Sequence, residues 1–205
     1  MALAVIACGV LFAFIPAEFR ISTTATIGFG VELLVLLAIL VIGDPGRIDR
    51  EVRWLRVVTT ILLLTITSAT MTSVVRLILG ILQKADFTSP GQLLIIGGVS
   101  WITLVITFAL WYWHLDSGGP AVRASGRIVT TPAFRFPEQG LPEFTDRGWY
   151  PEFVDYLALS FNTATAFSPS DVSAIRHWSK LMMISEAAVS LMLVALVVAR
   201  AVNVL

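Results

Sequence analysis

Oxygen-bearing side chains gather in one short segment of the chain, NTATAFSPSD, at residues 162–171. The hydroxyls of Thr165, Ser168 and Ser170 are followed directly by the carboxylate of Asp171. Such oxygens can take the place of water around a cation, and several carboxylates at the mouth of a pore attract cations. The segment therefore predicts an ion pathway, with these residues along it: Thr163, Thr165, Ala166, Phe167, Ser168, Pro169, Ser170 and Asp171.

Three ionisable residues lie inside apolar blocks of the sequence, namely Glu32, Arg76 and Glu186. A charge in the hydrocarbon core of a membrane costs about 2.5 kcal/mol or more, so each should face protein, water or a partner. Glu32 and Arg76 are predicted to pair across neighbouring helices. The alternative is that each side chain extends to its own membrane surface.

Glu186 also allows a second interpretation, because it shares one helical face with Ser190. If that face lines a pore, several Glu186 carboxylates would bind cations or protons on the axis. Equally, Glu186 would serve as a structural brace if it formed a hydrogen bond to a neighbouring short helix. The sequence leaves both alternatives open.

Other chemistries find little support in the sequence. Cys8 is the single cysteine, and His114 and His177 lie far apart without the spacing of metal ligands. There is no hydrolase signature, no phosphate-binding loop and no basic stripe for nucleic acid. We expect no enzymatic activity, no bound metal or other cofactor, and no nucleic-acid partner.

The elements that must position these residues are predicted to be membrane helices. Of the 205 residues, 57% are hydrophobic and 14% are charged, which argues against a soluble domain. Four apolar blocks, at about 23–43, 57–82, 92–114 and 181–203, reach the roughly 20 residues that a spanning helix needs. A fifth block, at 2–15, is shorter. We expect an all-α multipass protein of the lipid bilayer with about five transmembrane helices.

One predicted helix, at residues 151–165, is too short to cross a membrane. It begins with Pro151, which suits a first helical turn, and it carries Asp155 and Asn162. Between two full spans it reads as a re-entrant helix, although a surface helix is the alternative. The preceding loop, at 117–150, is rich in glycine, proline and charge, and an unidentified protein partner is expected to bind there if the loop serves as a docking surface.

The spacing in the second half of the chain resembles the pore unit of potassium channels: an outer helix, a pore helix, a filter and an inner helix. The approach to and exit from the filter pattern T-x-T-T-V-G-Y-G-D are resembled by Ser160, Thr163, Ala164, Thr165 and Asp171. The start of the inner helix is resembled by Trp178, Lys180 and Leu181. The string FALWYWHLDSGGP (108–120) is also similar to uncharacterised bacterial multipass proteins. The resemblance implies a homotetramer in a plasma membrane, here the bacterial inner membrane.

The filter itself departs from the family. Ala166 to Ser170 stand where the family has Thr, Val, Gly, Tyr and Gly. Pro169 fixes its φ angle and lacks an amide donor, and the two serines lack the freedom of glycine. We therefore expect a cation channel with an atypical, weakly selective filter, which would pass monovalent cations such as potassium or sodium.

This interpretation divides the chain into an N-terminal three-helix membrane region, 1–90, and a pore-like module, 91–205. The parts of the module are an outer helix at 92–114, an extramembrane loop at 117–150, a pore helix at 151–165, a filter-like segment at 163–171 and an inner helix at 176–203.

Two questions stay open at this point. Arginines at 47–56 and in the loop 117–150 lie on one side of the membrane, which the positive-inside rule assigns to the cytoplasm. A potassium channel instead presents its filter outside, and we favour that orientation. The competing functions are a non-conducting scaffold or accessory subunit with a pore-like fold and, with less support, a secondary transporter that uses Glu32, Arg76 and Glu186.

Overall fold

A computed structural model of the chain describes residues 2–14, 30, 34–35, 38, 53–83, 90–124, 131–141, 143, 149–165 and 171–204. Three of its helices are long and apolar enough to cross a membrane, by length and composition: Trp54–Leu82, Gly91–Gly118 and His177–Val202. The prediction of a helical membrane protein is confirmed at this level.

The bounds of the three long helices agree closely with the apolar blocks of the sequence. They are α3 (Arg53–Leu82), α4 (Pro90–Leu115) and α8 (His177–Val204). A shorter helix, α1 (Ala2–Phe14), has 13 residues and therefore a length of about 20 Å, less than the roughly 30 Å hydrocarbon core. Most of the predicted block 23–43 lies outside the described residues, so the count of five spans stays a prediction.

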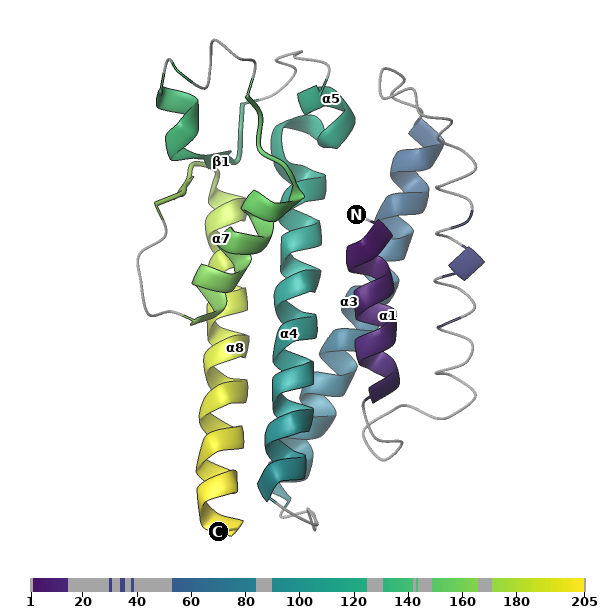
Figure 1. Cartoon of the computed structure of the whole chain (residues 1–205), viewed down its shortest axis with the longest axis vertical. Coiled ribbons are helices and arrows are strands. Elements are labelled where there is room, and N and C mark those ends of the chain that lie inside the picture. The colour runs from purple at the N-terminus through teal and green to yellow at the C-terminus, as the bar shows by residue number, and fades with distance from the viewer. Residues whose placement is uncertain are drawn as a thin grey trace.

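Helix α4 lies at the centre of the arrangement (Figure 1). It contacts α1, α3, α8 and the short helix α7 (Phe153–Thr165), and α8 contacts α3 at the end away from α7. The side chains of α4 are correspondingly well buried along most of its length, whereas much of α8 is exposed. Helix α4 is therefore the element against which the others are positioned.

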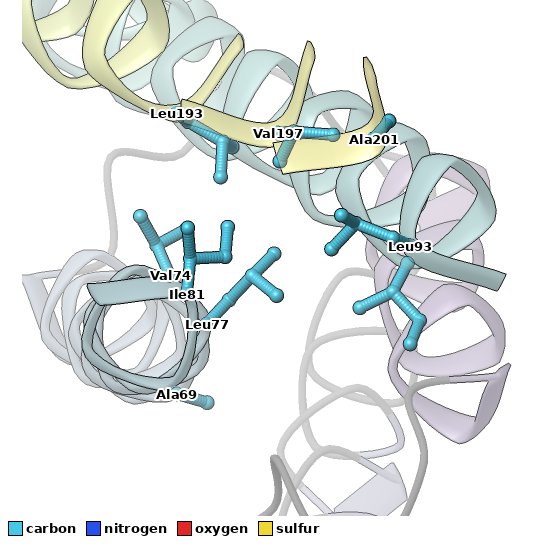
Figure 2. Packing of buried hydrophobic residues seen from close by; sticks show 9 residues of the cluster. Ala69, Val74, Leu77, Ile81, Leu93, Leu193, Val197 and Ala201 are labelled. Carbon is cyan, nitrogen blue, oxygen red and sulfur yellow. The ribbon is translucent and has the colours of Figure 1, made fainter. Parts of the chain in front are cut away.

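The lower half of the long helices packs through an apolar cluster. Val74, Leu77 and Ile81 of α3 face Leu193 and Val197 of α8 (Figure 2). On α4, Gly97 makes the approach of α8 possible, because a Cβ atom there would lie 2.7 Å from a methyl group of Val197. The absence of a side chain at Gly97 therefore sets how closely α4 and α8 can pack.

Buried hydroxyl groups join α3 to α4. The Thr70 and Thr107 hydroxyl oxygens lie 3.2 Å apart, and the Trp111 indole N–H donates to Thr67 at 2.7 Å. Thr107 also donates to the backbone carbonyl of Thr103. Hydrogen bonds of this kind hold helices together in lipid, where apolar contact between helices has no water to exclude.

The head of the molecule, defined as residues 113–124, 131–141, 149–156 and 171–179, covers one end of α4 and α8. The chain leaves α4 through a 3-10 turn, η2 (Asp116–Gly118), in which Ser117 and Gly118 have positive φ angles of 52° and 86°. It continues as α5 (Pro120–Ala124), β1 (Phe134–Arg135) and η3 (Pro137–Gly140). The described part of the predicted loop 117–150 thus contains regular structure.

A small antiparallel ladder closes the head. Strand β1 pairs with β2 (Ser173–Ala174), with Phe134 opposite Ala174 and Arg135 opposite Ser173. Strand β1 precedes α7 in the chain and β2 follows it. The segment that contains α7 therefore starts and finishes in the head.

Candidate functional site

Helix α7 begins in the head and extends about halfway along α8 (Figure 1). It runs antiparallel to α4. Tyr156 lies beside Asp116, and further along α7 the Ser160 hydroxyl donates to the Val105 carbonyl at 2.7 Å. The Phe161 ring then lies 5.5 Å from the Trp101 ring. Since β2 lies back in the head, the chain enters and leaves on one side. The re-entrant position in a membrane that the short length of the 151–165 helix predicts stays a prediction.

The C-terminal end of α7 is held by a set of three residues that we call the lower clasp: Trp101, Ala164 and Ser190. The Ser190 hydroxyl donates to the Ala164 carbonyl at 2.6 Å and accepts from the Trp101 indole N–H at 2.7 Å. Ser190 is fully buried. The lower clasp thus satisfies a carbonyl at the end of α7 that lacks a partner within the helix.

The middle of α7 is held by a second set, the middle clasp, formed by Val105 and Tyr112 of α4, Ser160 of α7 and Glu186 of α8. The Tyr112 hydroxyl donates to Glu186 Oε2 at 2.5 Å, and the Ser160 hydroxyl lies in hydrogen-bond contact with Glu186 Oε1. Tyr112, Ser160 and Glu186 are all fully buried. A single carboxyl group therefore links the three helices.

The start of α7 is held in the head by Asp116, whose side chain is fully buried. Its Oδ1 atom accepts from the backbone N–H groups of Ala133 at 2.6 Å and Phe134 at 3.4 Å. Its Oδ2 atom accepts from the Tyr156 hydroxyl at 2.6 Å. Asp116 thus fixes the end of α4, strand β1 and α7 relative to one another.

Arg123 completes this head cluster of Asp116, Arg123 and Tyr156. Its guanidinium donates to the backbone carbonyls of Asp116 at 2.7 Å and Trp113 at 2.9 Å, and its Cζ atom lies 5.0 Å from the centre of the Tyr156 ring. These carbonyls lie at the C-terminus of α4, where a positive charge is favourable. The buried Arg123 therefore caps α4 and stacks on the side chain that Asp116 binds.

Burial sets the electrostatics of this head cluster. It raises the pKa of the Tyr156 phenol well above the ordinary value of 10.0, an effect that Arg123 opposes and the Asp116 carboxylate increases. Burial also lowers the pKa of the Arg123 guanidinium, while Tyr156 and Asp116 act in the opposite direction. Arg123 stays charged at any physiological pH, because arginine does not lose its proton in proteins.

The structure places the predicted pathway residues as follows. Thr163 and Thr165 are partly buried near the end of α7, with their hydroxyls donating to the carbonyls of Leu159 and Asn162. Asp171 is exposed in the head. Ala166, Phe167, Ser168, Pro169 and Ser170 lie outside the described residues.

The two predicted inner-helix residues face the interior of the chain. Glu186 and Ser190 are fully buried against α4 and α7, so within one chain neither contacts an open axis. This placement favours the brace over the pore-lining role. Arg76 is partly buried on α3, and the pairing predicted for it remains a prediction because Glu32 lies outside the described residues.

Several residues that build this arrangement were not expected from the sequence: Trp101, Tyr112, Asp116, Arg123 and Tyr156. Tyr112, near the end of α4, is fully buried beside Phe134. A signal was present in Asp116, an acid that directly follows an apolar helix. Its partners could not be named because they come from residues 17 to 40 positions away.

Within the described ranges, no group of three or more His, Cys, Asp or Glu side chains could hold a metal ion. Comparisons of the chain with protein-family models, curated proteins and solved structures found no match.

Proposed function

We propose that this protein is a cation channel of the pore-loop type, with a homotetrameric pore in a bacterial inner membrane. The observation that carries the proposal is the placement of α7, which enters from the head, ends halfway along α8 and is held there by two buried clasps. If the long helices span the bilayer, α7 ends near its middle, and the segment that follows would begin at that depth. In a tetramer, four such segments would meet on one axis.

In this proposal the oxygen atoms of the segment after α7 coordinate the permeant ion. Thr163 and Thr165 keep free lone pairs while donating to backbone carbonyls. The serines of 166–170 would supply further hydroxyls, and Asp171 would attract cations at the mouth. Hydroxyls without stacked carbonyl rings would give weak selectivity between potassium and sodium.

Glu186 and Ser190 have a different role in this proposal from that of pore-lining groups. Each forms hydrogen bonds with α7 from a fully buried position. They would keep the pathway segment at a fixed depth rather than contact the ion. A proton relay of the kind a transporter uses receives less support, because the Glu186 carboxyl is enclosed by its bonding partners.

The first test is the mass of the intact complex in detergent by native mass spectrometry, followed by cation flux in proteoliposomes. We expect a tetramer that conducts. Asp171→Asn should lower flux by about tenfold at low ionic strength, and the difference should shrink as salt screens the charge. Glu143→Gln removes another exposed carboxylate and serves as the control. A stable monomer or dimer in nanodiscs would exclude the channel.

A non-conducting scaffold or accessory subunit is the second candidate. The head favours it, because the head cluster and the β1–β2 ladder hold residues 116–124 and 131–141 in a defined arrangement beside which a protein partner could bind. A tetramer that passes no cations at high density in liposomes would support this candidate over the channel.

A further inference from the structure

The middle clasp contains three close contacts between oxygen atoms. Tyr112 Oη lies 2.5 Å from Glu186 Oε2, Ser160 Oγ is in hydrogen-bond contact with Glu186 Oε1, and Ser160 Oγ lies 2.7 Å from the Val105 carbonyl oxygen. Each contact needs one proton, because two oxygen lone pairs at such a distance repel each other. The three contacts therefore need three protons.

Two of these protons come from hydroxyl groups. Tyr112 supplies the first, and Ser160 has a single proton for two acceptors. The Val105 carbonyl has no proton to give. If Ser160 donates to Val105, the remaining contact is satisfied when Glu186 itself carries a proton and donates to Ser160.

The surroundings of Glu186 agree with this count. Its side chain is fully buried, and its hydrogen-bond partners in the described part of the chain are two hydroxyl groups, neither of them basic. Tyr112 is the titratable group in contact with it. An ionised carboxylate buried without a cation costs several kcal/mol, whereas a carboxylic acid buried with its hydrogen bonds made does not.

We infer that Glu186 is a neutral carboxylic acid that positions α7 by donating its proton to Ser160 while it accepts from Tyr112. The chain of donors then runs in one direction, from Tyr112 to Glu186 to Ser160 to the Val105 carbonyl. This role goes beyond conduction and holds for a channel or a scaffold alike.

The infrared spectrum of the purified full chain at neutral pH tests the inference. A carboxylic acid has a C=O stretching band well separated from the bands of an ionised carboxylate. We expect the wild-type minus Glu186→Gln difference spectrum to show loss of a carboxylic acid band, whereas Glu152→Gln, at an exposed acid, should lose carboxylate bands. Loss of carboxylate bands alone in the Glu186 variant would overturn the inference.

A stability series gives an independent readout. Glutamine can donate an N–H to Ser160 and accept from Tyr112, so it replaces a neutral acid but not a carboxylate. We expect Glu186→Gln to keep a midpoint of thermal unfolding close to that of the wild type, whereas Glu186→Ala lowers it clearly. An equal decrease of the unfolding midpoint in Glu186→Gln and Glu186→Ala would contradict the inference that Glu186 is a neutral acid.

A third variant covers the case in which Glu186→Gln does not fold. Tyr112→Phe removes the donor to the acid C=O group, so the carboxylic acid band should shift to higher frequency while it remains present. An unchanged spectrum in this region would contradict the proposed direction of the hydrogen bonds.

Discussion

At the scale of single residues, Asp116 and Tyr156 connect most of the head. Asp116 receives hydrogen bonds from β1 and from α7, and Arg123 stacks on the ring whose hydroxyl Asp116 binds. The cluster combines a buried carboxylate that accepts three hydrogen bonds with a buried guanidinium that donates two, and such partners are what make buried charges tolerable. Removing one member of the cluster should therefore lower the free energy of unfolding by more than the loss of a surface contact does.

Tyr156→Phe tests this point. The substitution removes the hydroxyl that donates to Asp116 and keeps the ring packed against Phe136, with the centroids 5.2 Å apart. A hydrogen bond to a charged group contributes about 1.5–3 kcal/mol, so the free energy of unfolding in detergent should fall by that amount. Tyr150→Phe, at a side chain that is 41% exposed, is the control and should change little.

The same tyrosine predicts a dependence of stability on pH. Because burial raises the pKa of Tyr156 in the folded protein, the folded state holds its proton at a pH where the unfolded chain has lost it. The contribution of Tyr156 is complete below about pH 10 and declines as the pH rises further. Melting temperatures at about pH 8 and pH 11 should differ less in Tyr156→Phe than in the wild type; equal differences would contradict this assignment.

Residue-scale features were the hardest to predict from the sequence. The type of Glu186 and its place in an apolar block indicated a functional or bracing role, but its partners Tyr112 and Ser160 are 74 and 26 positions away. Which side chains meet is decided by how α4, α7 and α8 pack. The rotation of α4 and α8 about their own axes is not encoded in a local pattern, since most faces of these two helices are apolar.

At the scale of helices, the contact between α4 and α8 depends on one small residue. A methyl group at Gly97 would lie within 3 Å of two methyl groups of Val197, whereas one at Gly98 would have no atom within 4 Å. The two glycines are neighbours in one helix and have the same helix propensity. They therefore form a matched pair for testing this contact.

We expect Gly97→Ala to destabilise the protein by about 1–3 kcal/mol, because overpacking a tight contact costs that much. Gly98→Ala should be neutral or stabilising by up to about 1 kcal/mol, since alanine is the better helix former. Unfolding of both variants in the same detergent is the measurement. Restoration of stability by adding Val197→Ala to Gly97→Ala would confirm the contact, and equal behaviour of the two glycine variants would exclude it.

The helices themselves were largely predictable. Hydrophobicity and length placed α3, α4 and α8 within a few residues of their bounds, because a membrane span requires a long apolar run. Pro151 and the shortness of the following block indicated α7. The β1–β2 ladder was not expected, because two-residue strands have no periodic pattern to detect.

At the scale of the whole molecule, arginines in the head and on the adjoining end of α3 serve the fold. Arg56 donates to the Gly118 carbonyl, Arg123 caps α4, and Arg176 donates to the Thr131 carbonyl at 3.0 Å. Arginines with such roles are needed on whichever side the head faces. The number of arginines in this region is therefore weaker evidence that the head faces the cytoplasm.

We expect the head to face the outside of the cell. In a Cys8→Ser background, an engineered cysteine at the exposed Arg135 should react with a membrane-impermeant thiol reagent in intact cells. A cysteine at Gln83, exposed after the opposite end of α3, is the control and should react after the cells are opened. The reverse pattern would place the head in the cytoplasm.

The clasps also have a consequence for the order of events during biosynthesis. Two groups that bind α7 in the clasps, Glu186 and Ser190, belong to α8, which leaves the ribosome after α7. The strand β2 that closes the head ladder is likewise made after α7. Helix α7 thus emerges after its partners on α4 and before its partners on α8, so the two clasps can be complete only once α8 has been inserted. Completion of the clasps is therefore a late step, which follows the synthesis of α8.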